Sequence, residues 1–179
     1  MSPVASSDIM YRLLIQSVVD YAIYMLTPDG VVANWNPGAQ RAKGYSADEV
    51  VGKHYSLFYG DEDRAAGLPE QNLEQARRTG RFEEQGWRVC KDGSAFRAHV
   101  VIDAVRDEQG HLLGFAKVTR DISERHRYEL ELLEAKVLAE QYSQEMANLS
   151  RFLDSVIANI PASVIVQDLD SQRILLANQ

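Results

Sequence analysis

Five stretches of the chain have the short, apolar-rich pattern of β-strands, at residues 23–26, 31–35, 82–89, 95–105 and 112–120. Short segments that contain Asp and Gly join the first stretch to the second, the third to the fourth, and the fourth to the fifth. These are the residues that hairpin turns require. Consecutive strands joined by tight turns pair antiparallel. The pattern therefore predicts a five-stranded antiparallel sheet.

The segment between the second and third strands predicts short helices over residues 36–43, 46–51 and 69–78. Ser46 with Glu49 three residues later is a capping-box pattern, and the last of these helices stops before Gly80. Another helix is expected to start near Ile9 and to form an N-terminal flank over residues 1–20. Because the central helices fall between two groups of strands, we expect them on one face of the sheet, which is an α+β fold.

A different periodicity begins after Ile122. Apolar residues recur at alternating steps of four and three, without Gly or Pro, until Pro161. The seam consists of Tyr128, Leu132, Ala135, Ala139, Tyr142, Met146, Leu149 and Leu153, and continues to Val156 and Ile160. Such a seam predicts one long coiled-coil helix over residues 122–160, roughly 50 Å long. No neighbouring segment can cover its stripe, so we expect a homodimer through this helix.

The end of the chain repeats its beginning. Residues 15–19 match 153–157, residues 24–26 match 164–166, and residues 32–36 match 174–178. The domain organisation that follows is an N-terminal helical flank at 1–20, a first domain at 21–123, a coiled-coil linker at 124–151 and the truncated start of a second copy at 152–179. A helix and one hairpin bury little apolar area, so we expect this second copy to fray or to continue the helix unless a partner covers it.

The residue runs 30–39 and 43–53, together with 91–94, 113–115 and 119–123, resemble the two halves of a bacterial PAS (S-box) domain. The resemblance implies a five-stranded sheet that encloses a small pocket. It also implies that Asp121 and Ile122 couple the last strand to the outgoing helix. In this family such helices dimerise and signal to a downstream effector domain, commonly a histidine kinase of a two-component system and sometimes a cyclic-dinucleotide enzyme.

Composition narrows the function further. The net charge of −7 argues against binding to nucleic acid, because an acidic surface repels phosphates. The single cysteine, Cys90, suits a reducing compartment, so we expect a cytoplasmic protein. No apolar run reaches the roughly 20 residues that span a bilayer.

Phosphate loops, nucleophile elbows and metalloprotease motifs are missing from the sequence, and the acidic groups 61–63 and 83–84 do not indicate a metal site. We therefore expect no catalytic residue and no metal ligand in this fragment.

Two kinds of cofactor, covalently bound flavin and haem, require particular residues in a PAS sequence. The light-sensing flavin subgroup carries a cysteine on the short helix after Gly52, but residues 54–60 contain none, and Cys90 ends a strand instead. Haem needs an axial ligand such as histidine. His54 and His99 are the candidates, although a structural role suits both residues better.

A non-covalent flavin stays open as an alternative, with a pocket formed by Tyr24, Asn34, Asn36, Tyr45, Phe58 and Trp87. The competing interpretation is that these rings fill the core and that Asn36 caps a helix. The sequence therefore predicts a sensory and dimerising PAS module without enzyme activity of its own, upstream of a histidine kinase. The alternatives are a redox or gas sensor with bound flavin or haem, or the sensory region of a diguanylate cyclase or phosphodiesterase.

Overall fold

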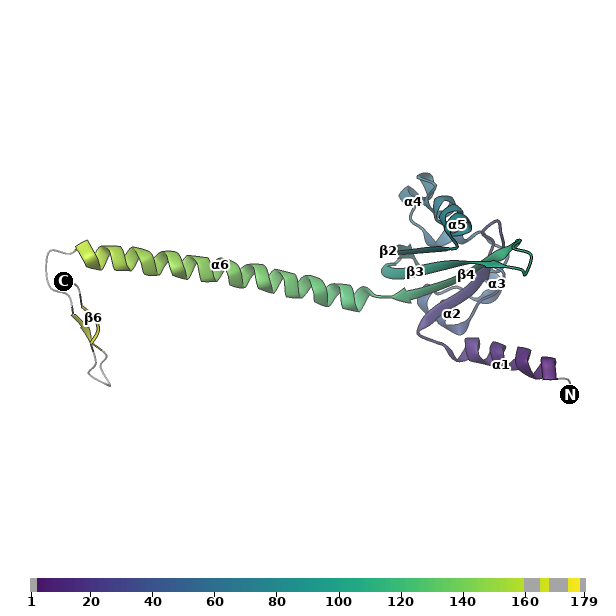
Figure 1. Ribbon diagram of the computed structural model, residues 1–179, viewed down its shortest axis with the longest axis horizontal. Helices are drawn as coiled ribbons and strands as arrows, with labels where there is room; N and C mark the ends of the chain where they lie inside the picture. The colour runs from purple at the N-terminus through teal and green to yellow at the C-terminus, as the bar shows by residue number, and fades with distance from the viewer. Residues whose placement is uncertain (1–2, 160–164, 168–173, 178–179) are drawn as a thin grey trace. The chain divides into compact units, whose positions relative to one another are not determined.

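The computed structural model describes residues 3–159, 165–167 and 174–177, with side chains from Ile9 to Asn159. The chain divides into two compact units, Met1–Arg127 and Tyr128–Gln179. The first unit contains a single antiparallel sheet of strands β1 (Tyr21–Leu26), β2 (Arg81–Val89), β3 (Ala95–Arg106) and β4 (Leu112–Asp121). Their spatial order is β1-β4-β3-β2, so the first strand lies beside the last (Figure 1).

The sheet has four strands, and the five expected from the sequence are one too many. Residues 31–35 make only two isolated bridges, Leu26 to Val32 and Val31 to His54. The reason is a competing partner: the Val32 amide donates to Lys53 O, and Val32 O accepts from Gly52 N, both at 2.9 Å. Val32 therefore pairs with the loop at Gly52 and Lys53, and the segment keeps only single hydrogen bonds to β1, such as Ala33 N to Met25 O at 2.9 Å, instead of a ladder.

Five short helical segments follow: α2 (Pro37–Lys43), α3 (Ala47–Val50), the 3-10 turn η1 (Tyr55–Phe58), α4 (Asp61–Ala65) and α5 (Leu68–Thr79). They cover one face of the sheet, as the α+β prediction requires, and contribute Ala39, Phe58 and Leu73 to the core. The capping box at Ser46 is confirmed, since Ser46 N donates to Glu49 Oε2 at 2.9 Å.

Two glycines with positive φ lie where the chain passes close to other atoms. Gly114 in β4 has φ +152°, and a Cβ atom there would lie 2.3 Å from Leu26 O. Gly30 has φ +80°, and a Cβ atom there would lie 2.5 Å from His54 Nε2. Both positions therefore favour glycine, and together they allow β1 and the turn after it to close against the sheet.

Helix α1 (Pro3–Ser17) begins earlier than the predicted start near Ile9. Helix α6 (Ser123–Asn159) confirms the long helix expected over residues 122–160. In the second unit, β5 (Ile165–Gln167) pairs antiparallel with β6 (Ile174–Ala177). These two segments therefore do not continue the helix, which corrects that part of the expectation. Their hairpin matches the repeat of residues 24–26 and 32–36 along the sequence.

Candidate functional site

The inner face of the sheet is set by the alternation along its strands. Lys117 of β4 pairs with Tyr24 of β1 on one side and with Ile102 of β3 on the other. All three side chains are buried. In the next inward row, Thr119 lies between Ala22 and Val100. Because side chains on one face of a sheet repeat every second residue, Lys117 points into the domain with the apolar residues around it.

Aromatic rings from the helical segments and β1 close over this face. The rings of Tyr24 and Trp35 lie 4.7 Å apart, and Trp35 stacks on Phe58 at 5.5 Å. Tyr45 meets Phe58 edge-on at 5.9 Å, and the Trp35 indole donates to Tyr45 O at 2.9 Å. The four rings thus form one packed cluster.

Three cationic side chains lie inside this shell: Lys43 at the end of α2, Arg88 near the end of β2 and Lys117 in β4. They are 0%, 2% and 1% exposed. Lysine and arginine are rarely buried to this degree without a paired acid. These three side chains form the buried cation cluster, which is the most unusual chemical feature of the domain.

Neither lysine ammonium has a hydrogen-bond partner among the residues the structure describes. Lys43 Nζ lies 4.4 Å from the centre of the Phe58 ring and 5.0 Å from that of Phe96. Lys117 Nζ lies 4.7 Å from the Tyr55 ring centre. Both ammonium groups therefore face aromatic π-systems instead of acceptor oxygens.

Arg88 is better held. Its Nη2 donates to Glu84 Oε1 at 2.7 Å and to Tyr59 Oη at 3.2 Å, and its Nη1 donates to Trp87 O at 2.7 Å. Asn72 Nδ2 also donates to Tyr59 Oη, at 3.2 Å. Arg88 Nε makes no hydrogen bond within residues 9–159. One ion pair, with an acid that is 37% exposed, therefore balances one of three buried cations.

These contacts do not offset the burial of three charges. A desolvated cation–π contact contributes about 2 kcal/mol. Removing an ion from water costs several kcal/mol even after the protein relaxes. A lysine in this position therefore gives up its proton or requires an anion.

The cost of burying a charge also shifts the pKa values of the side chains in this interior. Burial, and after it the neighbouring charge of Arg88, lower the pKa of Lys43 to about 7. Burial also lowers the pKa of Lys117, helped by Arg88 and Lys43. The hydroxyl pKa of Tyr24 is raised by burial. Because Arg88 lowers the pKa values of both lysines and Lys43 lowers that of Lys117, the three side chains form one electrostatic unit.

The residues predicted to line a pocket separate into two groups. Tyr24, Phe58 and Tyr45 belong to the ring cluster. Asn36 is buried but has a structural role: its Oδ1 accepts from Ile23 N at 2.9 Å and from Ala39 N at 2.8 Å, which caps α2. Its Nδ2 donates to the main-chain oxygens at positions 18 and 21. Asn36 thus ties the N-terminal flank, β1 and α2 together.

Asn34 and Trp87 lie outside the interior. Asn34 is exposed, and its Oδ1 accepts from Met25 N at 2.9 Å. Trp87 is 52% exposed, since it alternates with the buried Arg88. Cys90 is half-buried at the turn after β2, where its thiol donates to Ala42 O.

The two histidines considered for haem have structural partners. His54 caps the turn η1, with Nδ1 2.8 Å from Ser56 Oγ. His99 Nε2 lies 2.8 Å from Glu83 Oε1 on the outer face of the sheet. Among residues 9–159, no three or more His, Cys, Asp or Glu side chains are grouped to hold a metal ion.

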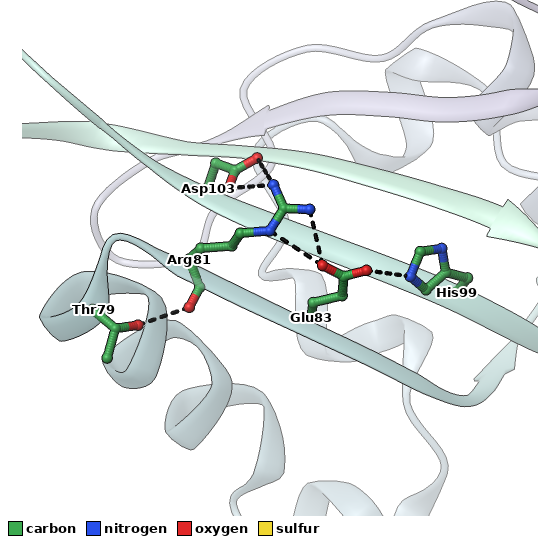
Figure 2. A network of polar contacts seen from close by, with 5 residues as sticks. All are labelled: Thr79, Arg81, Glu83, His99 and Asp103. Atoms are coloured by element: carbon green, nitrogen blue, oxygen red, sulfur yellow. Dashed lines mark hydrogen bonds and ion pairs between the residues drawn. The ribbon is translucent and has the colours of Figure 1, made fainter.

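Figure 2 shows the outer-face network to which His99 belongs. Arg81 Nη2 donates to Glu83 Oε2 at 2.9 Å, and Arg81 Nη1 donates to Asp103 Oδ1 at 3.2 Å. Thr79 Oγ1 donates to Arg81 O at 2.7 Å. On this face of β2 and β3, each of the charged groups drawn has a partner.

Sequence reasoning missed all three buried cations. Lys43 stands in the polar run before Gly44, which favours a solvent-facing lysine. Arg88 could have been found from the phase of its strand, because Phe82 and Arg88 fall on the same side of β2 while Trp87 falls on the other. Lys117 shares its phase with Phe115, which is a second signal of the same kind.

The junction between β4 and α6 is held by specific hydrogen bonds. Ile122 N donates to Arg97 O at 2.8 Å, and Ser123 N donates to Asp121 Oδ1 at 2.8 Å. Ser123 Oγ in turn accepts from Arg97 N at 2.9 Å. The first turn of α6 is therefore fixed to β3 as well as to β4. The ring of His126 also lies edge-on to Trp87, with centres 6.4 Å apart.

This architecture, a single antiparallel sheet covered on one face by short helices and continued by a long helix, is that of a PAS domain. The sequence model of the PAS fold family matches residues 9–122, so the chain belongs to this family and the resemblance is confirmed. It contains a sensory domain of a class that typically performs no catalysis.

Two curated relatives give the functional context. The chain is 47% identical over 119 residues to a "Two-component system protein A" of Emericella nidulans, covering 66% of this chain and 17% of that protein. It is 26% identical over 98 residues to a "Blue-light photoreceptor" of Listeria monocytogenes, covering 54% and 38%. The chain thus spans less than half the length of these relatives, and the name of the first refers to a two-component system.

Among solved structures, the PAS domain of a protein from Colwellia psychrerythraea superposes with a TM-score of 0.59 at 19% identity. The match covers 65% of this chain and 98% of that one. At this identity the likeness supports the fold. In the described part of the chain, helices of the length and apolar character needed to cross a membrane are not found.

Proposed function

We propose that this chain is the sensory and dimerising region of a cytoplasmic signal-transduction protein. A ligand or partner changes the PAS domain, and α6 passes the change to an effector domain in the same polypeptide. The observation that carries the proposal is the apolar seam of α6, whose residues are exposed: Leu132, for example, is 73% exposed. Such a stripe on a long helix is covered in a coiled-coil dimer.

The junction offers a physical route for the change. Asp121 is the last residue of β4 and accepts from Ser123 N of α6. Ile122 joins the two elements, and its amide donates to Arg97 O of β3. A shift in the twist of these strands would therefore rotate or tilt the first turn of α6. We assign residues 21–123 to the PAS domain, 124–151 to the coiled-coil linker and 152–179 to the start of a second PAS repeat.

The Emericella relative favours a histidine kinase as the effector, because its name places it in a two-component system. A diguanylate cyclase or phosphodiesterase in that position would be the alternative. The cytoplasmic location rests on the free thiol of Cys90, which suits a reducing compartment.

Sedimentation over a range of protein concentrations tests the dimer. We expect a reversible monomer–dimer equilibrium. Leu132→Glu should raise its dissociation constant about tenfold or more, because it introduces a charge into each copy of the seam. The matched control is Leu130→Glu, on the same helix but outside the seam. A wild-type chain that stays monomeric at every concentration, or equal effects of the two substitutions, would contradict the proposal.

Flavin fits this interior poorly. Covalent light chemistry needs a thiol beside the flavin ring. The chain's one cysteine, Cys90, lies directly after β2, and its thiol donates to Ala42 O in α2. For non-covalent binding, the rings of Tyr24, Trp35 and Phe58 already stack on one another. The protein as purified should show no visible absorption band near that of flavin or haem. A stoichiometric band would replace this proposal with a redox or gas sensor.

A further inference from the structure

Unpartnered donor groups converge inside the PAS domain from three different elements. The two lysine Nζ atoms and Arg88 Nε make no hydrogen bond in the described chain. Buried donors are nearly always satisfied in folded proteins. Three such cationic donors in one small interior indicate a missing acceptor.

These groups come together through the fold. Lys117 and Arg88 both approach the Tyr59 ring, at 5.7 Å and 4.1 Å from its centre. Lys43 lies over Phe96, which is paired with Arg88 across the β2–β3 ladder. The cluster therefore spans the inner face from the end of β2 to the middle of β4.

We propose that the interior of this PAS domain binds a small organic carboxylate, whose oxygens accept hydrogen bonds from Lys43, Lys117 and Arg88. The inference deepens the proposed function and rests on it, since it names the class of ligand that the sensory domain detects. Binding would supply the negative charge that the interior lacks.

The charge balance selects an anion. Glu84, the acid that acts on Lys117, is paired with Arg88 at the edge of the interior. Asp121, the acid that acts on Lys43, is exposed and accepts from Ser123 N. The interior proper therefore has cations without acids. A neutral ligand would leave this imbalance as it is.

The surroundings of the cations select an organic anion over an inorganic one. Each lysine lies against aromatic rings, and the neighbouring inward positions of β3 are Ala98, Val100 and Ile102. A carboxylate with an apolar body can place its charge on the cations and its hydrocarbon part against these side chains. Phosphate or sulfate has no such part. The flexible lysine stems can move to admit a small ligand.

The position of the cluster connects it to the output helix. Lys117 lies in β4, which leads directly to Asp121 and α6. Arg88 is the neighbour of Trp87, whose ring meets His126 in the first turn of α6. A carboxylate that draws Lys117 and Arg88 together would therefore act on β4 and β2, two of the strands that contact the start of the helix.

Isothermal titration and NMR of the whole chain test the inference, with benzoate and acetate as probes, benzamide and acetamide as neutral analogues, and phosphate as the inorganic anion. At constant ionic strength, benzoate should bind more tightly than benzamide and phosphate. It should also shift the side-chain methylene signals of Lys43 and Lys117. Lys117→Met should weaken benzoate binding about tenfold to a hundredfold, as expected for a lost charged hydrogen bond.

The matched control is Lys91→Met, which removes an exposed lysine that is paired with Glu49. It should leave benzoate binding unchanged. Equal binding of benzoate and benzamide, equal binding of benzoate and phosphate, or an unaffected Lys117→Met variant would each overturn the inference. Sedimentation of the same samples separates the two proposals. If the chain dimerises but does not bind benzoate, the proposed function stands and the carboxylate site is rejected. If the chain stays monomeric but binds benzoate, only the carboxylate site stands.

Discussion

The two faces of the β2–β3 ladder differ in how their charged side chains are paired. On the outer face, Arg81, Glu83, His99 and Asp103 pair with one another in contact with water (Figure 2). On the inner face, Arg88 has one partially exposed acid, and the nearby Lys43 and Lys117 have none among the described residues. Exposed ion pairs cost little to form and contribute little to stability, whereas unpaired buried ions are expensive. The inner face is therefore where charge indicates function.

The largest expected effect comes from Glu84, which neighbours Glu83 in sequence but points to the other face. Glu84→Gln leaves the buried Arg88 without its ion partner. Loss of one partner from a buried pair costs 3–5 kcal/mol, and the partial exposure of Glu84 reduces this to about 2–3 kcal/mol. Urea denaturation at neutral pH measures the change in the free energy of unfolding.

Glu83→Gln is the matched control because Glu83 is exposed on the outer face. Its effect on the free energy of unfolding should be clearly smaller than that of Glu84→Gln. If the two substitutions destabilise the protein equally, the contrast between the faces is wrong, and Arg88 is satisfied by Tyr59 and the carbonyl of Trp87 alone.

An intermediate effect is expected from the titration of Lys43. Its pKa is about 7 in the folded protein, against an ordinary lysine value near 10.5. Between these pH values the unfolded chain holds one proton more at this site than the folded chain, so stability rises with pH. The slope reaches about 1.4 kcal/mol per pH unit for one proton. Below pH 7 both states are protonated, and the folded protein bears the full cost of the buried charge.

Denaturation of the wild type and of Lys43→Met at several pH values from about 7.5 to about 9.5 measures this slope. The groups that act on Lys43 are Arg88, Cys90 and Asp121, and each remains in the variant. Lys43→Met should show a shallower rise in stability than the wild type. Identical slopes would mean that Lys43 does not titrate in this window.

Local sequence patterns predict some elements of this sheet and miss others. Period-two patterns and Asp-Gly turns locate β2, β3 and β4, because local sequence determines strands joined by hairpins. Residues 31–35 have the same pattern but do not form a strand, since Val32 bonds to the loop at Gly52 and Lys53. Such competition between distant segments leaves no mark in a local pattern.

Side-chain placement shows the same limit. Trp87 was expected to line the pocket as an aromatic residue, and Arg88, a charged one, was not among the residues expected there. The ladder places them the other way round, because Phe82 must be buried and a strand alternates from there. Residue type thus misled where the phase of the strand was informative.

The smallest expected effect lies on the outer face and appears only in acid. The hydrogen bond from Arg81, with a further contribution from His99, holds the pKa of Glu83 below its usual value. A carboxyl group with a lowered folded-state pKa stabilises the protein above its unfolded-state pKa, and this contribution is lost as the pH falls through the folded-state pKa. The stability difference between the wild type and Glu83→Gln should therefore be present at neutral pH and disappear on acidification.

Because Glu83 is exposed, added salt should shrink this difference, since a screened surface pair contributes less. Glu108→Gln, an exposed acid in the turn after β3, serves as the control for a simple change in net charge. A Glu83 effect that persists in acid and at high salt would show that the outer face does not behave as a solvated ion network. The two faces would then differ less in how they handle charge than in how deeply their side chains are buried.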